Sequence, residues 1–173
     1  MRLALAHPDW QITGIDPSAP MLAVAQRKVT AADLTDRVTL LPGSVSDLPD
    51  DARFDAATLL LVLHFLPDDG TKLAMLKAIA SRLRPGAPLI LADQHADLAN
   101  PEDRRLYRAW RARQIARGMP AEAADEMFAG LPQVIHCIPE SRLRALLTEA
   151  GFTTIQPIFR ALVIGAWLAH RST

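Results

Sequence analysis

Acidic and imidazole side chains follow directly after segments that are predicted to be strands. Asp16 ends the first such segment, Asp93 ends a later one, and His95 stands two residues beyond it. Ligands of open α/β sheets bind at the carboxyl ends of the strands, so these positions suit ligand binding and proton transfer. Asp16 can accept hydrogen bonds from both hydroxyls of a ribose. Equally, Asp16 or Ser18 can cap the helix that follows.

His64 stands at the end of another apolar segment and can act as a general base. The alternative is that it caps the turn before Pro67 and packs beside a ligand. The more favoured acid and base cluster comprises Asp93, Gln94, His95 and Asp97. His95 with a neighbouring carboxylate can also bind a metal, but matching ligands do not stand out elsewhere, so no metal site is predicted.

The elements that must position these residues alternate between strand and helix through the first 95 residues. Strands are predicted at residues 11–16, 37–41, 54–63, 88–93, 153–159 and 162–169. Helices are predicted at residues 18–32, 70–83, 100–117 and 139–150. The alternation predicts an α/β fold, with a mostly parallel sheet, helices on both faces and an antiparallel hairpin at the C-terminus. We expect a single domain over 1–173, with 97–135 as a helical insertion or lid.

The composition gives no support for nucleic acid as a partner or for a membrane-spanning segment. The formal net charge is zero, which gives no electrostatic reason to expect nucleic acid as a partner. No apolar run reaches the roughly 18 residues that a membrane span needs. The single cysteine, Cys137, is expected to be a buried or half-buried free thiol, and cytoplasmic residence is inferred.

Residues 104–113 are locally basic and contain two aromatic side chains, Tyr107 and Trp110. They can clamp an anionic substrate, or bind RNA with both rings stacking on bases. The alternative is an amphipathic helix with a solvated basic face and Leu106, Trp110 and Ile115 inward. Met119, Met127, Phe128 and Leu131 would add an apolar lid.

Four segments resemble, in their order and spacing, the motifs of class I S-adenosylmethionine-dependent methyltransferases. They are residues 14–22, with the Gly-Ile-Asp-Pro-Ser run, 37–49, 54–67, with the Leu-His-Phe-Leu-Pro turn, and 83–93, with the Leu-Arg-Pro-Gly turn. The likeness covers roughly 1–95 and resumes at 139–169. An NAD-dependent oxidoreductase also uses an acid after its second strand, but the turn at 63–67 and the terminal hairpin favour the methyltransferase.

The resemblance implies S-adenosylmethionine as the cofactor and a small molecule as the methyl acceptor. The implied cofactor contacts run from the ribose and adenine to the methionine moiety and comprise Asp16, Pro17, Met21, Ser44, Val45, Leu59 and Leu60. His64, Asp93 and His95 are the candidate catalytic residues. Many family members carry an acid where Ser44 stands, and Asp47 can substitute only if the loop bends differently.

The family's first strand and its glycine-rich loop have no counterpart here, because the eight glycines never cluster. That strand is central in the family's sheet, so its absence leaves unpaired edges at 11–16 and 54–63. Three routes can close the gap: a longer gene product, which we favour, direct pairing of the two edges, or a strand from another chain, as in a homodimer. We therefore expect an N-terminally incomplete methyltransferase with absent or impaired activity. The alternative is a non-catalytic, methyltransferase-like binding or regulatory subunit.

Overall fold

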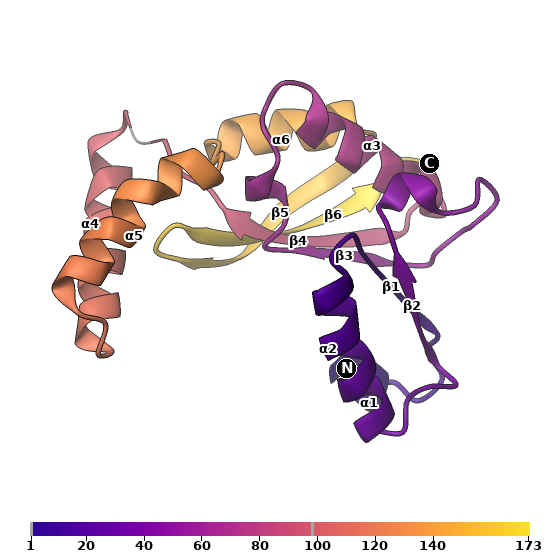
Figure 1. Ribbon diagram of the computed structural model, residues 1–173. Coiled ribbons are helices and arrows are strands. Elements are labelled where there is room, and N and C mark those ends of the chain that lie inside the picture. The colour runs from indigo at the N-terminus through magenta and orange to yellow at the C-terminus, as the bar shows by residue number, and fades with distance from the viewer. Residues whose placement is uncertain (1, 98) are drawn as a thin grey trace. The chain divides into compact units, whose positions relative to one another are not determined.

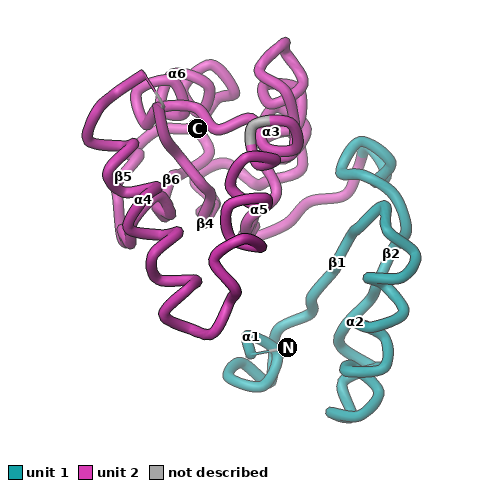
Figure 2. Tube along the Cα trace, turned by 60° about the vertical axis from the view of Figure 1, so that its left-hand side comes forward, with its two compact units in different colours: residues 1–50 teal, residues 51–173 magenta. Residues whose placement is uncertain are grey.

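The computed structural model describes residues 2–97 and 99–173 and contains two compact units, residues 1–50 and 51–173 (Figure 2). Each unit has its own sheet, with strand orders β1-β2 and β3-β4-β6-β5. Helices and strands alternate as predicted, which confirms the α/β class. The prediction of a single domain over 1–173 stays a prediction.

Unit 1 is a β-α-β segment preceded by a short helix and followed by a 3-10 turn. Its elements are α1 (Arg2–Ala6), β1 (Ile12–Asp16), α2 (Ala19–Ala31), β2 (Val38–Pro42) and η1 (Val45–Asp47). The two strands are parallel, so Asp16 lies opposite Pro42 where both strands end. A small apolar core of Ala4, Val29, Leu34 and Val38 holds the helices on this pair of strands.

Unit 2 is a four-stranded mixed sheet with helices. Its elements are β3 (Ala57–Leu60), η2 (Leu63–Phe65), α3 (Thr71–Arg82), β4 (Pro88–Gln94), α4 (Pro101–Ala116), α5 (Ala121–Val134), α6 (Glu140–Glu149), β5 (Phe152–Ala161) and β6 (Ile164–Arg171). β3 and β4 are parallel, whereas β6 is antiparallel to both β4 and β5. The predicted C-terminal hairpin is therefore confirmed, with its reversal at Leu162 and Val163.

The helices of unit 2 have two different positions (Figure 1). α3 and α6 lie on one face of the sheet and contribute buried side chains such as Leu76, Leu143 and Leu146. α4 and α5 pack against each other and form the predicted helical insertion between β4 and α6. A bridge between His95 and Ile138 marks where the chain leaves the sheet and returns to it.

The strand predicted at residues 54–63 is too long, since β3 is only Ala57–Leu60. Phe54 forms an isolated bridge with Leu83, and Leu61 has a φ angle of 57°. A left-handed residue cannot continue a pleated strand. The chain therefore turns after Leu60 and enters η2, which carries His64.

β1 and β3 each stand at the end of their own sheet, with one partner apiece among the described residues. Direct pairing between these two strands and strand donation by a second copy of the chain both stay predictions.

The α6 face of unit 2 offers a direct test of the packing. Leu146 is fully buried, so Leu146→Ala is expected to lower the free energy of unfolding by about 3 kcal/mol through the cavity it leaves. Leu5→Ala, on α1, is the matched control because that side chain is 61% exposed. Urea denaturation measures both variants, and equal effects would contradict this packing.

Candidate functional site

Asp16 occupies the turn between β1 and α2. One carboxylate oxygen, Oδ1, accepts a hydrogen bond from the Ser18 amide at 2.8 Å. Ser18 caps α2 by accepting from the Met21 amide at 3.4 Å. Of the two candidate caps, Ser18 is the one that caps α2, while Asp16 holds the turn before it. The second oxygen of Asp16 can accept from a ligand hydroxyl.

The predicted adenine-edge residue Ser44 lies beside an acid after all. The Asp47 carboxylate folds back and accepts from the Ser44 amide at 2.7 Å and from its hydroxyl at 3.0 Å. These bonds hold the pKa of Asp47 below its usual value. Gly43, with a φ angle of 122°, permits the bend, since a Cβ there would lie 2.7 Å from Asp47 Oδ2. This bend places the Asp47 carboxylate beside Ser44, and a role for Asp47 at the adenine edge stays a prediction.

The other predicted cofactor contacts differ in exposure. Met21 is 58% exposed on α2, and Leu60 is 54% exposed at the end of β3, so both side chains can contact a ligand. Leu59 is buried in the sheet, which leaves only its main chain for a ligand. Pro17 and Val45 follow the two strand ends of unit 1. The cofactor roles of all these residues stay predictions.

His64 and Asp93 meet in the interior of unit 2. The Nδ1 atom of His64 is hydrogen-bonded to Oδ1 of Asp93, and both side chains are buried. Where Asp93 accepts this bond from a neutral imidazole, Nδ1 is the donor and Nε2 keeps a lone pair. This is the arrangement of an oriented base. The structure thus pairs Asp93 with His64, whereas the sequence grouped it with His95 and Asp97.

His95 points elsewhere. Its ring packs edge-on against Trp167, with ring centres 5.2 Å apart. Its Nε2 is buried and has no hydrogen-bond partner in the described part of the chain. Gly165 makes room for the ring, since a Cβ there would come within 2.9 Å of it. Burial lowers the pKa of His95. A catalytic role for His95 stays a prediction, and these contacts show a packed side chain.

Asp97 and Gln94 also do not join the His64–Asp93 pair. Asp97 caps the local turn, where its Oδ1 accepts from the Ala99 amide at 2.9 Å. Gln94 follows Asp93 in β4, and successive strand residues point to opposite faces. Alternation therefore separates only Gln94 from Asp93, whereas His95 and Asp97 follow the end of β4 and make other contacts.

A cavity of about 290 Å³ lies between the insertion and the segment that returns from it. It is lined by Ala96, Asp97, Tyr107, Phe128, Leu131, Ile135, His136, Cys137 and Pro139. The main-chain amide of His136 donates to the His64 carbonyl at 2.6 Å. The wall of the cavity is thus joined by a hydrogen bond to the turn that carries His64.

The aromatic side chains of the basic segment pack inward. Tyr107 and Trp110 on α4 both meet Phe128 on α5 edge-on, with ring centres 6.3 and 4.9 Å apart. The Tyr107 hydroxyl lies 3.5 Å from Cys137 Sγ, and burial raises the pKa of both groups. Arg111 pairs with Asp125 at 2.5 Å across the two helices. These contacts favour the amphipathic-helix interpretation and confirm the half-buried free thiol.

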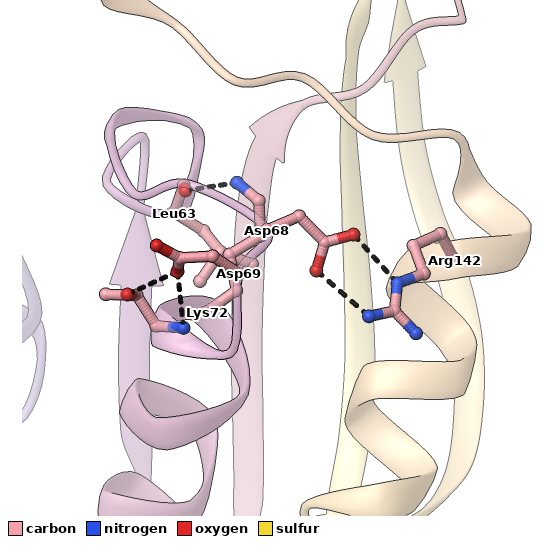
Figure 3. A network of polar contacts seen from close by, with 6 residues as sticks. Leu63, Asp68, Asp69, Lys72 and Arg142 are labelled. Carbon is pink, nitrogen blue, oxygen red and sulfur yellow. Dashed lines mark hydrogen bonds and ion pairs between the residues drawn. The ribbon is translucent and has the colours of Figure 1, made fainter.

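The turn after His64 is held by further polar contacts (Figure 3). Lys72 Nζ donates to the Leu63 carbonyl at 2.7 Å. Asp68 accepts two bonds from Arg142 of α6, at 2.8 and 3.0 Å, which hold its pKa below the usual value. Sequence analysis missed this set, because a lysine and an arginine on helices are ordinarily solvated.

The described residues were also compared with what a metal site and a membrane span require. The described residues contain no group of three or more His, Cys, Asp or Glu side chains that could hold a metal ion. No helix in the described ranges is both long and apolar enough to cross a membrane.

His95 makes the stability of the protein depend on pH. Its pKa in the folded state lies below the ordinary value of about 6.5, so the unfolded chain binds the proton first as the pH falls. The free energy of unfolding should therefore decrease from about pH 7.5 to about pH 5.5, and less so in His95→Gln. Thermal unfolding at each pH measures this. His136→Gln, at an exposed side chain, is the control, and parallel curves for His95→Gln and the unmodified chain would contradict the assignment.

Comparison with known proteins identifies the family. A model described as a methyltransferase domain matches residues 1–86. A demethylmenaquinone methyltransferase of Lactiplantibacillus plantarum is 30% identical over 172 residues, which cover 94% of this chain and 68% of the relative. A 27-O-demethylrifamycin SV methyltransferase of Amycolatopsis mediterranei is 34% identical over 134 residues, covering 76% of this chain and 47% of the relative.

Solved structures show the same fold. The mitomycin 7-O-methyltransferase MmcR superposes with a TM-score of 0.69 at 21% identity, over 98% of this chain and 44% of that chain. The S-adenosylmethionine-dependent methyltransferase SibL gives a TM-score of 0.67 at 19% identity, over 99% of this chain and 46% of that chain. The chain therefore spans about half the length of these structures. On this evidence the chain belongs to the S-adenosylmethionine-dependent methyltransferases, whose cofactor is S-adenosylmethionine.

Proposed function

We propose that this protein transfers a methyl group from S-adenosylmethionine to a small-molecule acceptor, with His64 as the general base. The observation that carries the proposal is the buried His64–Asp93 pair, one hydrogen bond away from the wall of a cavity large enough for a ring-containing acceptor. The relatives that support it are methyltransferases of quinones and of a rifamycin.

The residues of unit 1 fit the cofactor. Asp16 offers a carboxylate oxygen for ribose hydroxyls, and the Asp47 carboxylate beside Ser44 offers an acceptor for an amino group. When bound, S-adenosylmethionine supplies an electrophilic methyl group, whose carbon–sulfur bond breaks with the electron pair going to sulfur.

The residues of unit 2 suit proton removal from the acceptor. In the proposed step the acceptor oxygen forms the new bond to carbon while its proton passes to Nε2 of His64. Asp93 accepts from Nδ1 throughout and stabilises the imidazolium that results. Burial of the pair keeps competing water away from the base. His95 is the remaining candidate and would act only if its ring turned away from Trp167.

The lining of the cavity favours a flat, largely apolar acceptor. Tyr107, Phe128 and Leu131 supply ring edges and methyl groups, and Asp97 and Cys137 add a few polar atoms. Such a mixture of apolar walls with few polar groups is typical of small-molecule sites. A hydroquinone or phenol fits this description, and a long polymer does not.

His64→Gln tests the base. We expect labelled methyl transfer from S-adenosylmethionine to a soluble naphthohydroquinone to fall by about 10²–10⁴-fold, with affinity for S-adenosylhomocysteine unchanged. His7→Gln, on a ring that stacks on Trp10, is the control. Transfer at the rate of the unmodified chain in His64→Gln would exclude the general-base role.

Asp16→Asn tests the cofactor contact. Loss of a charge-assisted acceptor should weaken S-adenosylhomocysteine binding about tenfold in calorimetric titration. Asp36→Asn, at an exposed position of the same unit, should bind like the unmodified chain.

The same titration decides between the proposal and its alternative. We propose weakened affinity in the unmodified chain, because none of its eight glycines forms the family's glycine-rich loop. Complete absence of binding and of methyl transfer would instead favour the non-catalytic, methyltransferase-like subunit.

A further inference from the structure

Lys72 stands where a lysine is unfavourable on two grounds. Its side chain is 1% exposed, although an ammonium group loses its hydration when it is buried. It is also the second residue of α3, where the positive end of the helix dipole repels a cation. An apolar side chain of similar length would avoid both penalties, so the charge must do something that packing does not.

The contacts of Lys72 point to the turn that carries His64. Its Nζ donates to the carbonyl of Leu63, the first residue of η2, at 2.7 Å (Figure 3). The same carbonyl accepts from the Leu66 amide at 3.1 Å, which closes the turn. The ammonium group therefore lies at the residue directly before His64.

Charge links Lys72 to the partner of His64 as well. Burial lowers the pKa of Lys72, while the negative charges of Asp93 and Asp68 oppose that change. The attraction is mutual, so the ammonium group also attracts the Asp93 carboxylate. Only an ionised carboxylate is restricted to accepting from Nδ1, which keeps the lone pair of His64 on Nε2.

Two other hydrogen bonds hold this turn, and neither of them does what Lys72 does. The His136 amide holds the His64 carbonyl at 2.6 Å, and Arg142 holds Asp68 beyond the turn. Both fix the path of the main chain. Among these three restraints, Lys72 alone brings a buried positive charge to the His64–Asp93 pair.

We propose that Lys72 is a positioning residue for His64: through the Leu63 carbonyl and the charge on Asp93, it holds the imidazole as the Nδ1-protonated tautomer. The proposal rests on the proposed function for its consequence in catalysis. Its structural content stands without it, because the tautomer is measurable in the free protein.

Nitrogen NMR of the chain labelled at histidine tests the proposal. In the unmodified protein, His64, assigned by its loss in His64→Gln, should show a protonated Nδ1 and an unprotonated Nε2. Lys72→Met should shift His64 toward a mixture of tautomers or remove its Nδ1 proton signal. Lys77→Met, on the exposed face of the same helix, is the matched control and should leave the spectrum unchanged.

The outcomes separate this proposal from the proposed function. An unchanged His64 signal in folded Lys72→Met overturns the positioning role, whatever the activity. If Lys72→Met does not fold, Lys72→Gln, which keeps a donor but no charge, is compared, and an unchanged signal overturns the role equally. Should the unmodified chain transfer methyl groups, kcat should fall about 10–100-fold in Lys72→Met with KM for S-adenosylmethionine unchanged. A chain without methyl transfer would refute the proposed function and leave the NMR result decisive.

Discussion

A buried imidazole and a buried carboxylate must hydrogen-bond to each other. This requirement constrains where β4 and η2 lie in unit 2. Burying either group alone would cost several kcal/mol, on the order of the net stability of a small domain. β4 must therefore present Asp93 on the face that α3 and α6 cover, and η2 must bring His64 down onto it. The left-handed Leu61 ends β3 early enough for the turn to form. The contact between His64 and Asp93 thus depends on where one short strand ends.

The sequence was most informative where a single physical pattern decides the structure. Apolar strands, capped helices and Pro-Gly turns gave the order of elements, because each depends on neighbouring residues. Asp16 and Ser18 likewise show the local capping that their spacing predicts. Both residues of the candidate dyad were also recognised from their positions at strand ends.

Contacts between segments that are far apart in the sequence were harder to predict. His64 and Asp93 are 29 residues apart, and nothing local says that the imidazole turns toward β4 rather than capping its own loop. His95 resembles an active-site histidine in the sequence, yet the chain leaves the sheet there and its ring packs on Trp167. The burial of Lys72 could not be predicted from the sequence for a related reason. Whether a lysine on a helix is solvated or buried depends on what packs over it.

The proposed base and the cavity belong to different parts of unit 2. The sheet and its first turn hold His64 and Asp93, whereas the insertion and its return segment supply Tyr107, Phe128 and most of the cavity wall. The His136–His64 hydrogen bond connects the two. Because this bond uses main-chain atoms, the side chains of α4 and α5 can change without disturbing the base.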